Sequence, residues 1–183
     1  MIHSFTDKLE YSMGEREKFD IQLLRQAICG CVGIKKTDTE TDKTGIDYIA
    51  TLRGGAQVFI DAKTREPGAR RYWRDEPELA LEKWSVVPTP QNHGKTGWTL
   101  SEESLVDMIL YTFDKSDCDR FFILPFQHLR MAFVHNVKAW ERMYPWKQQR
   151  SGSWRSEAMF VPASVVLDAV MREMTGKAQR AAS

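Results

Sequence analysis

Apolar residues recur at helical spacing over the first part of the chain. Between residues 6 and 29 they fall three or four positions apart, which predicts a helix, either continuous or divided into two pieces at Gly14. Gly30 and Gly33 follow and end the stretch. The polar segment 36–44 is expected to form a loop.

The clearest pattern comes next, where two short runs rich in β-branched and aromatic residues flank a pair of glycines. The runs are residues 46–52 and 57–63, and Gly54 and Gly55 lie in the segment between them. Alternating runs separated by a glycine turn are typical of a β-hairpin. We therefore predict a hairpin over residues 46–63.

Further strands and helices are expected along the rest of the chain. Strands are predicted at 79–87, 108–113 and 120–124, and helices at 126–143 and from Pro162 to about Met174. Segments 66–75 and 89–97 are expected to be loops. The resulting order of helix, several strands, helix and helix predicts a mixed α/β or α+β layer fold with a central, mostly antiparallel or mixed sheet flanked by helices.

Composition bounds the domain count and the compartment. The chain has 183 residues, of which 42% are hydrophobic, so one domain over residues 1–175 with a disordered tail at 176–183 is expected. Three cysteines fit neither a disulfide framework nor a four-ligand zinc site, which favours a reducing cytosol. Neither a signal peptide nor a membrane span is evident, so a cytoplasmic protein without membrane contact is expected.

Net charge excludes a strongly basic coat. Lys and Arg number 26 and Asp and Glu number 25, so any surface that attracts nucleic acid must be local. Two segments are candidates for such contacts. One is 147–155, which contains no acid and is expected to be an exposed loop; the other follows the hairpin. Their candidate DNA-binding residues are Lys147, Arg150 and Arg155, and Arg70, Arg71 and Arg74.

Two charged residues at the end of the second hairpin run are candidates for chemistry. Asp61 and Lys63 are two positions apart, so on a strand they lie on one face, and they follow an apolar run that gives no reason for an acid and a base. Carboxylates that hold Mg²⁺ can activate water and neutralise a phosphate. A hairpin with an ordinary Asp–Lys pair is the alternative reading.

Hairpin register decides whether Asp47 joins this pair. A two-residue Gly54-Gly55 turn would send Asp47 to the face opposite Asp61, whereas a three-residue loop at 53–55 would place the two acids directly across from each other. Glycine fills the positive-φ position of such a loop easily. We predict an odd-length loop or a bulge.

These residues resemble the signature of a known nuclease superfamily. Gly45-Ile46-Asp47, thirteen residues and then Asp61-Ala62-Lys63 are similar to the PD-(D/E)XK, or restriction-endonuclease-like, motif, and a helix followed by a hairpin is similar to the opening of that fold. The resemblance covers roughly residues 10–65. Ile46 stands in place of the proline that gives the motif its name.

The resemblance implies a restriction-endonuclease-like fold and a site for hydrolysis of DNA phosphodiesters. It implies that Asp47, Asp61 and the carbonyl of Ala62 bind Mg²⁺, for which Mn²⁺ can substitute, and that Lys63 orients or activates the attacking water. Such proteins often add an acid from the first helix. Glu17, in line with the helix face expected to meet the sheet, is our choice here, and Asp20 and Glu82 are the alternatives.

A second function class fits the same residues. A catalytically silent nucleic-acid-binding or interaction protein on the same fold, such as a regulatory or anti-defence factor, would keep the fold without turnover. The sequence leaves the substrate form open between double-stranded DNA, single-stranded DNA, a junction and RNA. A homodimer and an origin in a phage or bacterium are further expectations.

Overall fold

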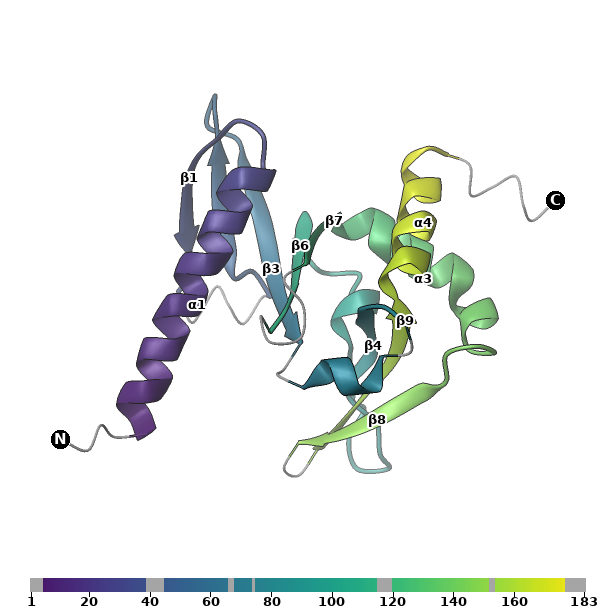
Figure 1. Ribbon diagram of the computed structural model, residues 1–183. Helices are drawn as coiled ribbons and strands as arrows, with labels where there is room; N and C mark the ends of the chain where they lie inside the picture. Colours follow the sequence, from purple (N-terminus) through teal and green to yellow (C-terminus); the bar gives the residue numbers. More distant parts are fainter. Residues whose placement is uncertain are drawn as a thin grey trace. The chain divides into compact units, whose positions relative to one another are not determined.

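The computed structural model describes residues 5–38, 45–65, 68–73, 75–114, 120–151 and 154–176. Over these residues the protein is a mixed α+β structure with three helices and two sheets (Figure 1). The chain divides into two compact units, the first of residues 1–63 and 105–110, the second of residues 64–104 and 111–183. Each unit is described separately, and the expectation of one domain stays a prediction.

The first unit begins with a long helix. Helix α1 (Phe5–Ala27) runs through Gly14 without a break, so of the two possibilities the continuous helix is the one observed. A single glycine weakens a helix by only about 1 kcal/mol relative to alanine, which neighbouring turns can absorb. Leu23 and Leu24 near its end are buried.

Three antiparallel strands follow α1 in the first unit. They are β1 (Cys31–Lys36), β2 (Tyr48–Leu52) and β3 (Gln57–Arg65), and β2 pairs with both of the others. The sequence pattern predicts β2 and β3 but not β1, whose glycine and two lysines conceal the strand. Tyr48, Ala50 and Ile60 on the paired strands are buried and provide core to this unit.

The loop between β2 and β3 has three residues. The amide of Leu52 donates a hydrogen bond to the carbonyl of Ala56 at 2.8 Å, which leaves Arg53, Gly54 and Gly55 as the loop. Gly54 and Gly55 have φ of 90° and 87°, values that side chains with a Cβ rarely adopt. The prediction of an odd-length loop is confirmed.

A mixed five-stranded sheet continues from β3. Its order is β1-β2-β3-β6-β7, where β6 is Met108–Phe113 and β7 is Phe121–Pro125. Both strands lie within one or two residues of the predicted ranges. In the first unit Phe59 and Asp107 exchange hydrogen bonds at 2.8 Å, the Asp107 amide to the Phe59 carbonyl and the Phe59 amide to Oδ2 of Asp107.

A four-stranded antiparallel sheet forms the centre of the second unit. Its order is β5-β4-β9-β8, with β4 (Glu78–Val86), β5 (Lys95–Thr96), β8 (Trp146–Ser151) and β9 (Trp154–Pro162). One face is wholly buried at Leu79, Leu81, Met159 and Val161. The Trp146 ring, which shares this face with Met159, contacts Phe133 of a helix at 6.0 Å between ring centroids.

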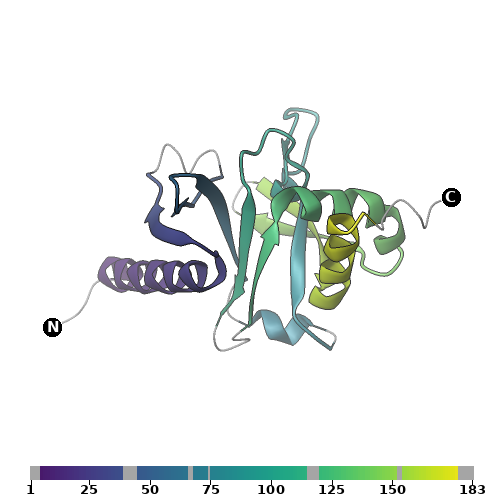
Figure 2. The ribbon, with the colours of Figure 1, turned by 90° about the horizontal axis from the view of Figure 1, so that it is seen from above.

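Two helices complete the second unit. They are α3 (Phe126–Trp140) and α4 (Ala163–Met174), which pack against each other (Figures 1 and 2). The prediction of a helix to residue 143 overestimates α3 by one turn, whereas the prediction of α4 after Pro162 is confirmed. Short 3-10 turns, η1 (Ala69–Tyr72) and η2 (Trp98–Leu100), lie in or beside the expected loops.

The largest difference from the sequence prediction is at residues 147–155. The expected exposed loop is a β-hairpin, because β8 pairs with β9 from Trp146 opposite Met159 to Ser151 opposite Trp154. Polar residues on both faces of β8 remove the apolar alternation by which a strand is recognised in the sequence. The strand forms because β9, which is paired with β4, offers an edge with which β8 can pair. No helix in the described ranges combines the length and apolar character of a membrane span.

Candidate active site

Strand β3 carries an acid and a base in contact. Nζ of Lys63 lies 2.7 Å from Oδ1 of Asp61, although the Asp61 residue is only 5% exposed and the Lys63 side chain 31%. Residues two apart on a strand point to the same face, and the contact confirms the prediction that these two do. Because burial of an unpaired carboxylate is costly, the lysine supplies the compensation that Asp61 requires.

Asp47 lies one residue before β2 and contacts β3 at the end of the hairpin. The pairing of β2 with β3 runs from Thr51 opposite Gln57 to Tyr48 opposite Ile60, and the placement of Asp47 directly across from Asp61 stays a prediction. The amide of Asp47 donates to the carbonyl of Ile60 at 2.9 Å, and Oδ2 of Asp47 accepts a hydrogen bond from the amide of Ala62 at 2.7 Å. The carboxylate of Asp47 is therefore held against the Asp61-Ala62-Lys63 segment.

A buried acid from α1 lies close to this hairpin. Asp20 is 3% exposed, and its carboxylate accepts hydrogen bonds from Nε of Arg16 at 2.9 Å and from the hydroxyl of Tyr48 at 3.1 Å. Burial raises the pKa of Asp20, while Arg16 and the Tyr48 hydroxyl oppose that rise and the charge of Asp47 adds to it. Asp20 thus joins the helix to the residue that follows Asp47.

Several negative charges act on the phenol of Tyr48. Burial raises its pKa first, and the charges of Asp20, Glu17 and Asp47 raise it further. Glu17 is more accessible than Asp20, because its side chain is 39% exposed, and it forms an ion pair with Lys36 at 3.8 Å. The role chosen for Glu17 stays a prediction, as does the alternative role of Asp20.

Glu82, the other alternative, belongs to the second unit. Its carboxylate accepts hydrogen bonds from Oγ of Ser85 at 2.6 Å and from the amide of Trp98 at 3.4 Å. These hydrogen bonds give the Glu82 carboxylate a structural role, because they join β4 to η2. The contacts of Asp47, Asp61 and Lys63 described above all lie in the first unit.

The oxygen donors near the hairpin are of the kind that a hard divalent cation prefers. Asp61 provides a carboxylate on β3, Asp47 provides one from the residue before β2, and Ala62 provides a carbonyl between Asp61 and Lys63. Across the ranges that the structure describes, no group of three or more His, Cys, Asp or Glu side chains is arranged to hold a metal. Mg²⁺ is commonly bound by one or two carboxylates with water and phosphate oxygens in its other positions, so two acids are sufficient.

The predicted DNA-contacting residues all belong to the second unit. Arg70 and Arg71 are exposed on η1, and Arg74 lies outside the described residues. Lys147 and Arg150 on β8 and Arg155 on β9 are exposed as well. Their exposure agrees with a contact role, which stays a prediction.

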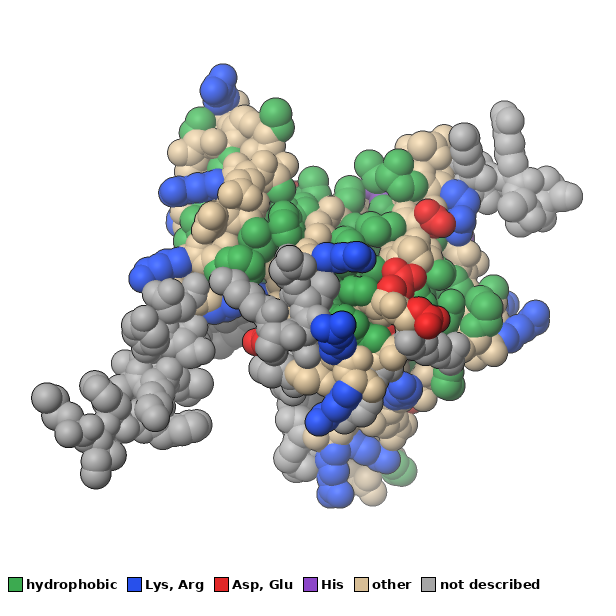
Figure 3. All heavy atoms as spheres, viewed as in Figure 1, with side chains coloured by type: hydrophobic (Ala, Val, Ile, Leu, Met, Phe, Trp, Pro, Cys, Tyr) green, Lys and Arg blue, Asp and Glu red, His purple; other side chains and the backbone are tan. Residues whose placement is uncertain are grey.

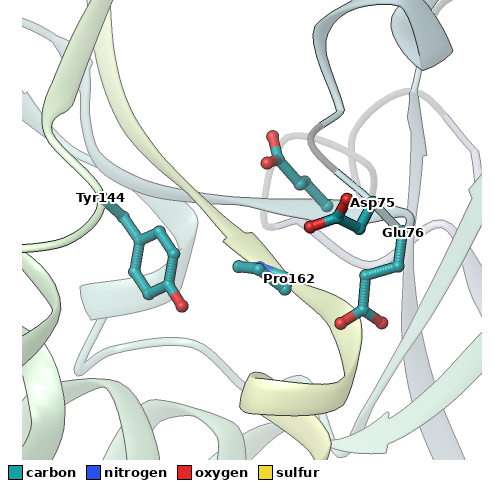
Figure 4. A pocket seen from close by; sticks show the side chains of 5 residues that line it. Asp75, Glu76, Tyr144 and Pro162 are labelled. Atoms are coloured by element: carbon teal, nitrogen blue, oxygen red, sulfur yellow. The ribbon is translucent and has the colours of Figure 1, made fainter.

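A small acidic pocket of about 160 Å³ also lies in the second unit (Figure 4). Asp75, Glu76, Glu78, Tyr144 and Pro162 line it. Glu76 accepts hydrogen bonds from the amide of Ser164 at 3.2 Å and from its hydroxyl at 2.5 Å, so this carboxylate caps the first turn of α4. One acid of the pocket, Glu76, therefore has a structural role.

Sequence reasoning missed Arg16 and Tyr48 as parts of the candidate site. Arg16 lies four residues before Asp20 on α1, a spacing that brings side chains together on a helix and could have indicated the pair. Tyr48 reads as an ordinary buried strand residue. Its bond to Asp20 joins residues 28 apart in sequence, and no local pattern reveals such a contact.

Comparison with known proteins adds no assignment. No protein-family model matches the chain, and neither the curated proteins nor the solved structures include a significant match.

Proposed function

We propose that this protein is a metal-dependent nuclease that hydrolyses DNA phosphodiester bonds, with a restriction-endonuclease-like fold and with Asp47, Asp61 and Lys63 at its active site. The observation that supports this most directly is that Oδ2 of Asp47 accepts a hydrogen bond from the amide of Ala62, the residue after Asp61, while Lys63 contacts Asp61. The mixed sheet and the helix that precedes the hairpin agree with the same proposal.

The burial of these charges is the second support. An acid that is 5% exposed at the end of an apolar run costs folding free energy, and a paired lysine only offsets that cost. Hydrophobic residues of similar size would often be neutral or more stabilising there. Charges kept at such a position indicate a chemical use.

Each residue has a separate task in the proposed reaction. Hydrolysis adds water across a P–O bond, so the attacking oxygen loses a proton and the leaving oxygen gains one. Lys63, as an ammonium paired with Asp61, has no lone pair and acts as a hydrogen-bond donor that orients the water or a phosphate oxygen. The amide of Ala62 holds the carboxylate of Asp47 in place before substrate arrives.

Asp47, Asp61 and the carbonyl of Ala62 are the groups that would hold Mg²⁺ or Mn²⁺. When bound, such an ion lowers the pKa of a coordinated water and stabilises negative charge on the phosphate. The contact with Lys63 holds the Asp61 carboxylate on the face that it shares with the lysine.

Cleavage of supercoiled plasmid and of single-stranded DNA tests the proposal. Wild type with Mg²⁺ or Mn²⁺ should nick or degrade DNA, and EDTA, Asp61→Asn and Lys63→Ala should each abolish the product. Lys35→Ala is the matched control, because Lys35 is an exposed lysine on β1, and it should cleave as wild type does. Cleavage that survives both EDTA and Asp61→Asn would overturn the proposal.

The alternative is a catalytically silent nucleic-acid-binding or interaction protein on the same fold. It predicts that DNA is bound in EDTA and that no metal-dependent product forms with any nucleic acid. The same assay, run with a binding measurement on the same samples, separates the two.

A further inference from the structure

Two cations of the second unit converge on one aromatic ring. Cζ of Arg65, the last residue of β3, lies 4.6 Å from the ring centroid of Phe160 on β9, and Nζ of Lys147 on β8 lies 5.2 Å from the same centroid. Lys147 pairs with Ala158, two residues before Phe160, so the lysine and the ring share one face of the sheet. In Figure 3, Lys and Arg side chains lie at the surface over the area where Figure 1 draws β8. Arg65, Lys147 and Phe160 are called the Phe160 cluster below.

Neither cation of the Phe160 cluster has an acidic partner in the part of the chain that the structure describes. Nε of Arg65 is also buried there without a hydrogen-bond partner. The two distances to the ring place the charges of Arg65 and Lys147 within about 10 Å of each other. Like charges this close repel, and a buried donor without an acceptor destabilises the folded state. A single anion between the two side chains would relieve both costs.

The one titratable group on which the charge of Arg65 is seen to act is Tyr111 of β6. Burial raises the pKa of Tyr111 to about 12, and the charge of Arg65 opposes that rise. The phenol is therefore uncharged at neutral pH. Its oxygen accepts a hydrogen bond from the amide of Ala80 at 2.8 Å. Tyr111 thus supplies no negative charge that would balance the guanidinium.

The acids of the adjacent strand have other uses. Glu78 and Glu82 lie on the same face of β4 as Ala80, which pairs with Phe160. The carboxylate of Glu82 accepts the two hydrogen bonds that join β4 to η2, and Glu78 lines the acidic pocket. Over the described ranges neither acid forms an ion pair with a cation of the Phe160 cluster. The negative partner of these cations must therefore come from a ligand.

Attraction to the ring is the competing explanation of the same geometry. A cation over the face of an aromatic ring is attracted to it, and the stem of a lysine can rest on apolar surface without any ligand. This explanation accounts for one cation on the ring of Phe160. It gives no reason for a second like charge beside the first, and it leaves Nε of Arg65 without an acceptor. The two cations together favour an anion.

The chemistry of the two cations indicates which anion fits. A guanidinium presents parallel N–H donors that bind two oxygens of a carboxylate or a phosphate, whereas an ammonium is a compact point charge. A carboxylate has only two oxygens, and the fork of Arg65 would already engage both. A phosphate group has further oxygens that can face Lys147. Lys147 is exposed, so the site is open to solvent on that side.

We propose that Arg65 and Lys147 bind a phosphate group beside the ring of Phe160. Two sources share this chemistry, namely free phosphate and the phosphodiester backbone of a nucleic acid. The inference goes beyond the proposed nuclease, because the phosphate is held by these two cations whether or not Asp47 and Asp61 support cleavage.

Calorimetric titration of the full chain with inorganic phosphate, at constant ionic strength and in EDTA, tests the proposal. Wild type should bind phosphate, and Arg65→Gln and Lys147→Gln should each raise the Kd about tenfold or more, because each removes a charged donor. Lys138→Gln on α3 and Arg172→Gln on α4 are the matched controls. They remove the same charges from exposed positions and should bind phosphate as wild type does.

A stability measurement separates loss of binding from loss of fold. Because Lys147 is exposed, the Tm of Lys147→Gln without phosphate should equal that of wild type. Arg65→Lys keeps a cation against the ring but replaces a two-donor fork by a point charge, so it should fold and bind phosphate more weakly than wild type. Absence of phosphate binding by wild type, wild-type affinity in Lys147→Gln, or an equal loss in the control variants would each overturn the proposal.

Binding of labelled single-stranded and duplex oligonucleotides in EDTA distinguishes the two sources of phosphate. If the Phe160 cluster binds a nucleic-acid backbone, Lys147→Gln should weaken oligonucleotide binding and inorganic phosphate should compete with it. If the cluster binds free phosphate, Lys147→Gln should lose phosphate affinity and leave oligonucleotide binding unchanged.

Failure of this inference can be told apart from failure of the proposed function. Asp61→Asn should retain the phosphate affinity of wild type, because the proposed contacts do not include it. If wild type cleaves DNA but binds no phosphate through Arg65 and Lys147, the phosphate site is wrong and the nuclease stands. If phosphate binds through these residues but no nucleic acid is cleaved, the nuclease is wrong and the phosphate site stands.

Discussion

The amide of Ala62, the residue after Asp61, donates a hydrogen bond to Oδ2 of Asp47 at 2.7 Å, at the end of the hairpin that lies away from its turn. This bond fixes the direction of the Asp47 carboxylate without using the side chain of Asp61 or Lys63. Structure and charge at Asp47 can therefore be separated by mutation.

Asp47→Asn keeps an acceptor for the Ala62 amide and removes the charge. We expect the unfolding free energy of this variant to lie within about 1 kcal/mol of the wild-type value, because a neutral hydrogen bond replaces a charge-assisted one. We also expect the variant to lose cleavage. Asp47→Ala loses the acceptor too and should be destabilised by about 1–3 kcal/mol. Urea unfolding and plasmid cleavage are the measurements. Cleavage at the wild-type rate by Asp47→Asn would contradict a role for its charge.

Glu17→Gln tests whether the accessible acid of α1 supports metal binding. Glu17 is 39% exposed and contributes to the negative potential at Tyr48, so its charge should favour a cation nearby. We expect the Mg²⁺ concentration for half-maximal cleavage to rise about three- to tenfold with little change in the maximal rate, since two carboxylates remain. Loss of its pair with Lys36 should cost at most about 1 kcal/mol, as for other exposed pairs. An unchanged Mg²⁺ dependence would remove Glu17 from the site.

Asp20 gives a prediction about pH. Its folded-state pKa is raised above the ordinary value of 3.8, with burial as the largest cause. Between the unfolded and the folded pKa the folded protein binds more protons, so the contribution of Asp20 to the unfolding free energy is greatest below the unfolded value and falls as pH rises through the folded one. The difference in unfolding free energy between wild type and Asp20→Asn should therefore decrease as pH rises above about 4.

Urea titrations of both proteins at a series of pH values measure this difference. Tyr48→Phe is the companion variant, because it removes the hydroxyl that donates to Asp20 and should raise the pKa of Asp20 further. The decrease should then extend to higher pH. A difference that rises with pH would show that Asp20 is stabilised in its charged form.

The sequence predicted the part of the fold that local patterns determine. The hairpin, its three-residue loop, and strands β4, β6 and β7 follow from period-two alternation and from two glycines that accept positive φ. The sequence was sufficient to predict these features, because they depend on residues that are close together along the chain.

Other features depend on partners that are distant in sequence. Strand β8 has no apolar alternation and forms because β9 is held by β4, and the bond between Asp20 and Tyr48 needs α1 to pack on β2. The shared face of Asp61 and Lys63 was expected from their spacing, but the ion pair between them and its burial depend on the rest of the unit. The helical pattern does not show which acid of α1 is exposed enough to take part in the candidate site.

The three-residue loop at Arg53–Gly55 holds two consecutive glycines at positive φ. A Cβ at either glycine would strain the turn, because residues with a side chain rarely adopt that backbone conformation. Engineered or related hairpins of this length should therefore keep both glycines, whereas the exposed Arg53 can vary. Two adjacent glycines after a short β-branched run are the feature to look for when this hairpin is sought in other sequences.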